Sequence, residues 1–99
     1  MSPSEWIGKT VLVTTELRGV FCGVLKDVVR ADHTAALTNA RNCTYWSADV
    51  RGFLGLAAKG PTSSCRIGPA APSVFLEGVT SISLCTDNAV AAWEAEPWA

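Results

Sequence analysis

The segment from Arg41 to Trp46 holds the side chains best suited to bind a ligand. It carries a guanidinium at Arg41, an amide at Asn42 and aromatic rings at Tyr45 and Trp46. Proteins commonly hold nucleotides by stacking a base on Tyr or Trp while an arginine contacts a phosphate. These residues therefore indicate a site for a small anionic ligand such as a nucleotide. The alternative is structural: Tyr45 and Trp46 end a core strand, and Arg41 forms a solvated ion pair.

Further basic side chains extend this candidate site. Lys59 and Arg66 flank a glycine-containing stretch, in which Gly60 is expected to leave backbone N–H groups open to an anion. Arg18, in a predicted turn, is either exposed for recognition or paired with Glu16. Solvated loop charges account for these residues equally well.

No catalytic or metal-binding pattern is readable. The sequence has no Ser/His/acid order, paired carboxylates or phosphate-binding glycine loop, so we expect no enzyme activity and no cofactor. The single histidine, His33, is predicted to be an exposed loop residue. The cysteines are spread without a C-x-x-C pair, which gives no support to zinc and favours buried, reduced thiols. They are Cys22, Cys43, Cys65 and Cys85.

Composition limits the partners. Ninety-nine residues predict a single domain, 1–99. Hydrophobic residues make up 48% and charged residues 17%, which is apolar enough to predict homo-oligomer interfaces. The net charge of −1 gives no overall attraction to long polyanions. Because neither a membrane-spanning apolar run nor a signal-peptide pattern is present, we expect a cytoplasmic protein without membrane contact.

Alternation and turn residues predict a mainly β fold of about five strands. A helical turn over residues 2–8 is predicted to precede strands over 10–15, 20–29, 35–46, 65–67, 73–76 and 79–84, the fourth being only a short candidate. Gly23 indicates a bulge or sharp bend. Residues 47–72 are an insertion, in which 53–58 is a short strand or a helical turn. A C-terminal helix is predicted over about 87–96, capped by Thr86 and ended by Pro97.

These elements describe an SH3-like small barrel, and two motifs resemble the Sm-like family. Residues 8–13, followed by 18–25 and Asp27, are similar to the family's first motif, and residues 76–82 to its second. The resemblance implies rings of about five to seven subunits closed by edge-to-edge strand pairing. It also implies RNA binding at the ring pore. The chain departs from the family where Ala35 replaces a base-contacting asparagine and Glu77 replaces an arginine, because a carboxylate there repels phosphate.

Residues 39–46, 55–61 and 65–69 also resemble small uncharacterised bacteriophage proteins. Three functions are therefore open. The first, favoured by the cluster at 41–46, is a non-enzymatic homo-oligomer that captures a nucleotide or cyclic-nucleotide signal, countering host defence if the protein comes from a phage. The second is an Sm-like ring that binds RNA or other single strands. The third is a phage structural or host-protein-interaction module.

Overall fold

A computed structural model describes residues 3–16, 19–46 and 48–97 of the chain. Within these ranges the fold is mainly β, as predicted, with a short 3-10 helix, Pro3–Trp6, before the first strand. The strands are β1 (Thr10–Thr15), β2 (Val20–Val29), β3 (Thr34–Tyr45), β4 (Arg66–Ile67), β5 (Ala71–Leu76) and β6 (Val79–Leu84). The α-helices are α1 (Phe53–Ala58) and α2 (Asp87–Ala95). In the described part of the chain, neither helix is long and apolar enough to cross a bilayer.

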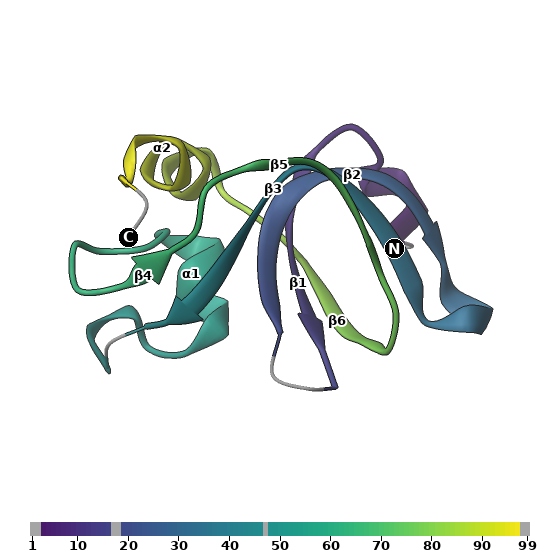
Figure 1. The fold of residues 1–99 in the computed structure, drawn as a ribbon, viewed down its shortest axis with the longest axis horizontal. Coiled ribbons are helices and arrows are strands. Elements are labelled where there is room, and N and C mark those ends of the chain that lie inside the picture. The colour runs from purple at the N-terminus through teal and green to yellow at the C-terminus, as the bar shows by residue number, and fades with distance from the viewer. Residues whose placement is uncertain (1–2, 17–18, 47, 98–99) are drawn as a thin grey trace.

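The strands form one antiparallel sheet that curls on itself (Figure 1). Their order is β4–β3–β2–β1–β6, and β5 pairs with a different part of β3. The long β3 holds both partners, because residues 35–40 pair with β5 and residues 43–45 pair with β4. Strands β5 and β6 therefore occupy outer positions in the sheet, although only residues 77–78 join them in sequence.

A bulge bends the sheet where the sequence places Gly23. Between the pairs Cys22–Arg41 and Val24–Thr38, strand β3 contains one residue more than β2. A Cβ atom on residue 23 would lie 2.9 Å from the Thr38 carbonyl oxygen, so the close approach of the two strands requires glycine. The predicted bend is confirmed.

Side chains alternate across β1 into two cores. Leu12 belongs to one core, whereas Val11 and Val13 belong to the other, and all three are fully buried. The first core also contains Val20, Cys22, Cys43, Val50, Leu56, Ala57, Cys65, Ile67, Cys85, Ala89 and Trp93. The second contains Leu25, Ala35, Leu37, Ala40 and Leu76. The four cysteines are buried free thiols, as predicted.

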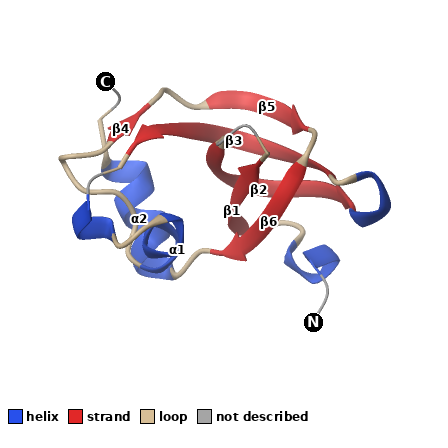
Figure 2. Ribbon diagram, turned by 90° about the horizontal axis from the view of Figure 1, so that it is seen from below, coloured by secondary structure: helices blue, strands red, loops and turns tan. Residues whose placement is uncertain are grey.

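Helices α1 and α2 lie together at one end of the sheet and cover the first core (Figure 2). The indole Nε1–H of Trp93 donates to the Leu56 carbonyl oxygen at 3.1 Å. The Thr86 hydroxyl accepts from the Ala89 N–H at 3.1 Å and donates to the Ala58 carbonyl oxygen at 2.7 Å. The predicted N-cap is therefore confirmed, and it also joins the two helices. The sequence predicts either a short strand or a helical turn over residues 53–58, and this segment is helical.

Candidate functional site

The turn that follows the first Sm-like motif and the turn within the second meet at one end of the sheet. The backbone N–H of Val79, which follows the β5–β6 turn, donates to the carbonyl oxygen of His33 in the β2–β3 turn at 2.9 Å. The strand register agrees with this contact, since Ala35 pairs with Leu76. A hollow of about 250 Å³ opens here, which we call the turn hollow. It is lined by Val28, Val29, Arg30, His33, Thr34, Val79, Thr80, Ser81 and Ile82.

The turn hollow offers a cation, an imidazole ring and several hydroxyl groups. Arg30 and His33 are exposed, and a left-handed backbone at His33 (φ 56°) ends the 3-10 turn Arg30–Asp32 and leads into β3. On the other wall, the Thr14 hydroxyl is hydrogen-bonded to the hydroxyls of Thr80 at 2.8 Å and Ser81 at 2.5 Å. Guanidinium and hydroxyl groups bind phosphate and sugar oxygens, and an exposed imidazole ring can stack on a base.

The two departures from the Sm-like motifs also lie beside the turn hollow. Ala35 is only 1% exposed and packs in the second core, so this position offers no polar group to a ligand. Glu77 is exposed in the β5–β6 turn, and Asp32 is exposed next to His33. Carboxylates close in sequence to the lining residues His33 and Val79 oppose the attraction of Arg30 for phosphate. The turn hollow therefore has mixed charge.

The predicted site residues did not include Arg30, His33 or Thr80. The expectation that His33 is an exposed loop residue is correct, but the loop is the one that meets the second motif. The signal that could have identified these residues is the placement of the two motifs at strand ends. Once β3 pairs with β5, the turns that precede β3 and follow β5 must lie side by side.

Arg41 lies at the other end of the molecule and binds backbone carbonyl groups. Its Nε–H donates to Gly68 at 2.8 Å, and Nη1 donates to Trp93 at 2.5 Å and Glu96 at 2.7 Å. The Trp93 carbonyl has no partner within α2, because the residue four positions later is Pro97, which lacks an N–H. Arg41 thus fastens the end of α2 to β3, and these N–H groups are already engaged.

Tyr45 and Arg66 are exposed neighbours on paired strands. Cys43 is buried, whereas Tyr45, two residues later on β3, is 52% exposed. The register of β3 against β4 shifts between these two residues. Asn42 is also exposed, whereas Trp46 is partly buried and packs against the first core. The cluster at 41–46 is therefore divided between the core and the surface.

The remaining predicted residues do not join this cluster into one site. Lys59 is exposed at the end of α1. The Gly60 N–H donates to the Leu56 carbonyl oxygen at 3.1 Å, so the expectation that it is open to an anion is wrong. Arg18 lies outside the described residues.

A larger hollow of about 410 Å³ lies between the bulge of the sheet, the loop before β5 and α2. We call it the helix hollow; it is lined by Thr10, Cys22, Gly23, Val24, Asn39, Arg41, Pro69, Ala70, Val90, Trp93, Glu94 and Glu96. Because it carries two carboxylates and one arginine, its charge disfavours a phosphate-bearing ligand. In the described ranges, no three His, Cys, Asp or Glu residues gather as metal ligands.

The fold agrees with comparisons to known proteins. The structure is similar to that of a heptameric archaeal Sm protein, with a TM-score of 0.53 and 19% sequence identity over 84% of this chain and 94% of that chain. At this identity the likeness shows the fold alone, and it confirms the predicted Sm-like barrel. No curated protein matches the chain with significant similarity. Residues 8–93, from the start of the barrel to Trp93 in α2, match a family model, and the chain therefore belongs to the family described as Domain of unknown function (DUF6948).

Proposed function

We propose that the protein forms a homo-oligomeric ring and that its turn hollow binds single-stranded nucleic acid, RNA in the first instance. The observation that carries the proposal is the backbone contact between Val79 and His33. This contact joins the β2–β3 turn to the β5–β6 turn, and Arg30, the imidazole ring and the hydroxyl groups line one hollow there. The site therefore combines backbone-binding and base-stacking groups in each subunit.

The outer strands support assembly into a ring. Among the described residues, β5 pairs with β3 and β6 pairs with β1, which leaves each strand one edge for another copy of the chain. Phe75 on β5 and Leu84 on β6 are 64% and 40% exposed. Pairing β5 of one subunit with β6 of the next would cover both. The archaeal Sm protein of similar fold is heptameric, and its structure has implications for the eukaryotic snRNP core. A heptamer of this fold is consistent with such a ring.

Repetition of the site compensates for the absence of net positive charge. A ring presents Arg30 and His33 once per subunit, and a strand that contacts several subunits gains from effective concentration. Each phosphate contact also releases counterions, so affinity falls as salt rises. Since the chain carries a net charge of −1, we expect binding that is measurable at low salt and weak at physiological salt.

The test combines native mass spectrometry with fluorescence anisotropy. The first measures assembly as multiples of the 10.4 kDa subunit. The second measures binding of labelled oligo-U and oligo-A at low and moderate salt. Arg30→Ala should weaken binding about tenfold or more, because every subunit loses a phosphate contact. Arg66→Ala is the matched control: it removes an exposed arginine on β4, outside the turn hollow, and should change affinity less than about twofold.

Each outcome decides one part of the proposal. A ring that binds neither oligonucleotide at low salt would contradict nucleic-acid binding. A monomer under all native conditions would contradict the assembly. Equal losses in the two arginine variants would exclude the turn hollow as the binding site.

Capture of a small nucleotide has weaker support. The N–H groups of Arg41 that would contact a phosphate are engaged by carbonyl groups, and Glu94 and Glu96 line the adjacent helix hollow. Calorimetry with mono-, di- and cyclic nucleotides is the direct comparison. A role in phage infection, a cytoplasmic location and the absence of enzyme activity stay predictions from the sequence.

A further inference from the structure

The buried thiols of Cys22 and Cys85 lie close together, although 63 positions separate them in the sequence. Their Sγ atoms are 4.0 Å apart. Cys22 is on β2, and Cys85 follows β6, where its backbone N–H donates to the Thr10 carbonyl oxygen at 3.1 Å. The two residues therefore lie on either side of β1.

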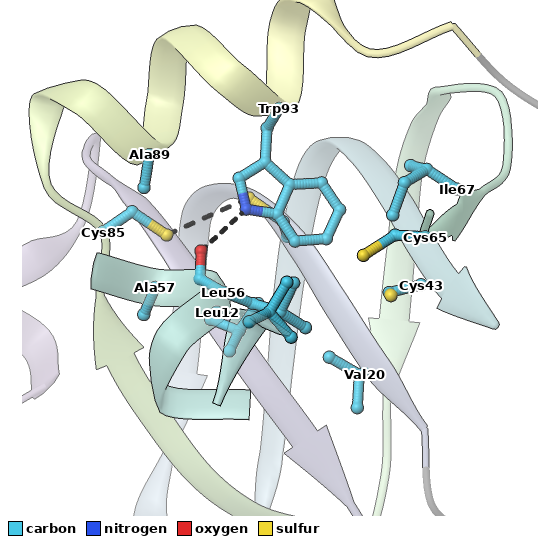
Figure 3. Close-up of a cluster of buried hydrophobic side chains, with 12 residues drawn as sticks. Leu12, Val20, Cys43, Leu56, Ala57, Cys65, Ile67, Cys85, Ala89 and Trp93 are labelled. Atoms are coloured by element: carbon cyan, nitrogen blue, oxygen red, sulfur yellow. Dashed lines mark hydrogen bonds between the residues drawn. The ribbon is translucent and has the colours of Figure 1, made fainter. Parts of the chain in front are cut away.

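The curl of the sheet brings the two sulfur atoms together. Leu12 on β1 pairs with Cys22 on one side and with Ser83 on the other. Directly paired residues share a face, and Cys85 is two residues beyond Ser83, so the side chains of all these residues point to the same face. That face is the first core, which contains both cysteines. Figure 3 shows Cys85 there beneath α2, apart from Cys43 and Cys65.

The environments of the two thiols make Cys85 the more acidic of the pair. The hydrogen bond with Cys22 lowers the pKa of Cys85 and raises the pKa of Cys22, while burial raises both. Cys85 also directly precedes Thr86, the N-cap of α2, where the helix dipole favours a thiolate. Cys22 lines the helix hollow, so the hollow reaches one thiol of the pair, whose sulfur lies 4.0 Å from that of Cys85.

We propose that Cys22 and Cys85 form a dithiol that a hydroperoxide oxidises to a disulfide. The Cys85 thiol releases its proton, and the thiolate attacks the terminal peroxide oxygen. The O–O bond breaks, Cys85 becomes a sulfenic acid, and the alkoxide takes up the released proton and leaves as the alcohol (or water, from hydrogen peroxide). Cys22 then attacks the Cys85 sulfur, the S–O bond breaks, and the hydroxide leaves as water with the Cys22 proton. The two thiols supply the two electrons that reduce the peroxide.

The product would link β2 to the beginning of α2 across β1. The disulfide would close a loop of chain between Cys22 and Cys85 that contains most of the barrel and the whole insertion. This closure would reduce the conformational freedom of the unfolded chain. Oxidised protein should therefore unfold at a higher temperature than reduced protein. This inference concerns the first core and does not depend on nucleic-acid binding.

Tryptic peptide mapping provides a direct test, because each cysteine lies in its own peptide. Cleavage after Lys and Arg places the cysteines in peptides 19–26, 42–51, 60–66 and 67–99. Folded protein is treated with hydrogen peroxide, its remaining thiols are alkylated in denaturant, and it is digested without reductant. We expect peptides 19–26 and 67–99 to be linked, with a mass two hydrogens below the sum of the two.

Serine substitutions provide matched controls. Cys85→Ser should abolish the link, whereas Cys65→Ser, an equivalent change in the same core, should retain it. Circular dichroism establishes whether each variant is folded; if Cys85→Ser is not, the wild-type peptide map decides. Three outcomes would each overturn the proposal. They are four unreacted thiols after peroxide treatment, linkage of Cys43 to Cys65 that is faster than linkage of Cys22 to Cys85, and a Cys22–Cys85 link that forms only in denaturant.

Discussion

Replacing Arg41 by alanine tests whether this residue holds α2 on the sheet. The substitution removes three hydrogen bonds from a charged donor to the carbonyl oxygens of Gly68, Trp93 and Glu96. Such bonds contribute about 1.5–3 kcal/mol each when taken separately. Because Arg41 is partly buried, water can solvate the freed carbonyl groups, and three bonds from one group are not additive. We therefore expect a loss of about 3 kcal/mol in the free energy of unfolding.

Urea unfolding followed by tryptophan fluorescence and circular dichroism measures this loss. A 3 kcal/mol change corresponds to a fall in Tm of roughly 12–24 °C for a domain of this size. Arg41→Lys keeps the charge but cannot reach three carbonyl groups at once, so it should recover only part of the stability. Arg66→Ala, at an exposed position, should cost less than about 0.5 kcal/mol. If Arg41→Ala costs as little as Arg66→Ala, the fastening role is refuted.

Two further predictions concern packing and pH. Gly60 and Gly52 both have positive φ, but a Cβ atom on Gly60 would lie 2.5 Å from the Ala92 Cβ, whereas one on Gly52 meets nothing within 4 Å. Gly60→Ala should therefore lower stability by about 1–3 kcal/mol more than Gly52→Ala, and equal urea midpoints would contradict this. Burial, followed by the influence of Cys65, raises the pKa of Cys43 to about 11, above the value of about 8.5 for an unfolded thiol. The folded state keeps the proton that the unfolded state loses, so the associated stability is complete below about pH 8.5 and is lost towards pH 11. Urea midpoints under reducing conditions should fall between pH 8 and pH 10, and fall less in Cys43→Ala; a wild-type midpoint that stays constant would refute the argument.

Elements with a strong local pattern could be predicted from the sequence. Strands β1, β2 and β6 have the predicted bounds, and α2 ends one residue early, because alternation, turn residues and the Thr86 cap are all local signals. Strand β5 begins at Ala71, two residues before its predicted start. Pro72 argues against a strand at this point, because proline has no N–H for a sheet hydrogen bond. An outer strand nevertheless tolerates proline. Helix α1 could not be assigned, because a six-residue helix depends on tertiary contacts such as the bond between Leu56 and Trp93.

The arrangement of the candidate sites was harder to predict, because it depends on long-range contacts. The residue types at 41–46 suggest binding, but the carbonyl groups that engage Arg41 come from the loop before β5 and from the end of α2. The turn hollow depends on the pairing of β3 with β5, which brings His33 to Val79. The approach of Cys22 to Cys85 likewise requires two strands separated by β1 to converge. None of these contacts has a signal within a short stretch of sequence.

The dual pairing of β3 determines how the molecule could be made smaller. The chain leaves this strand after Tyr45, pairs with its end again through β4, and pairs with its barrel part at Ala71, which lies opposite Ala40. A short linker in place of the residues between Tyr45 and Ala71 would leave the barrel strands connected. Such a deletion would remove the Leu56 carbonyl group that Trp93 binds, and it would uncover part of the first core, including Leu12 and Val20. If the C-terminal helix were removed as well, Leu12 and Val20 would lose their cover, so a smaller barrel also requires polar residues at these two positions.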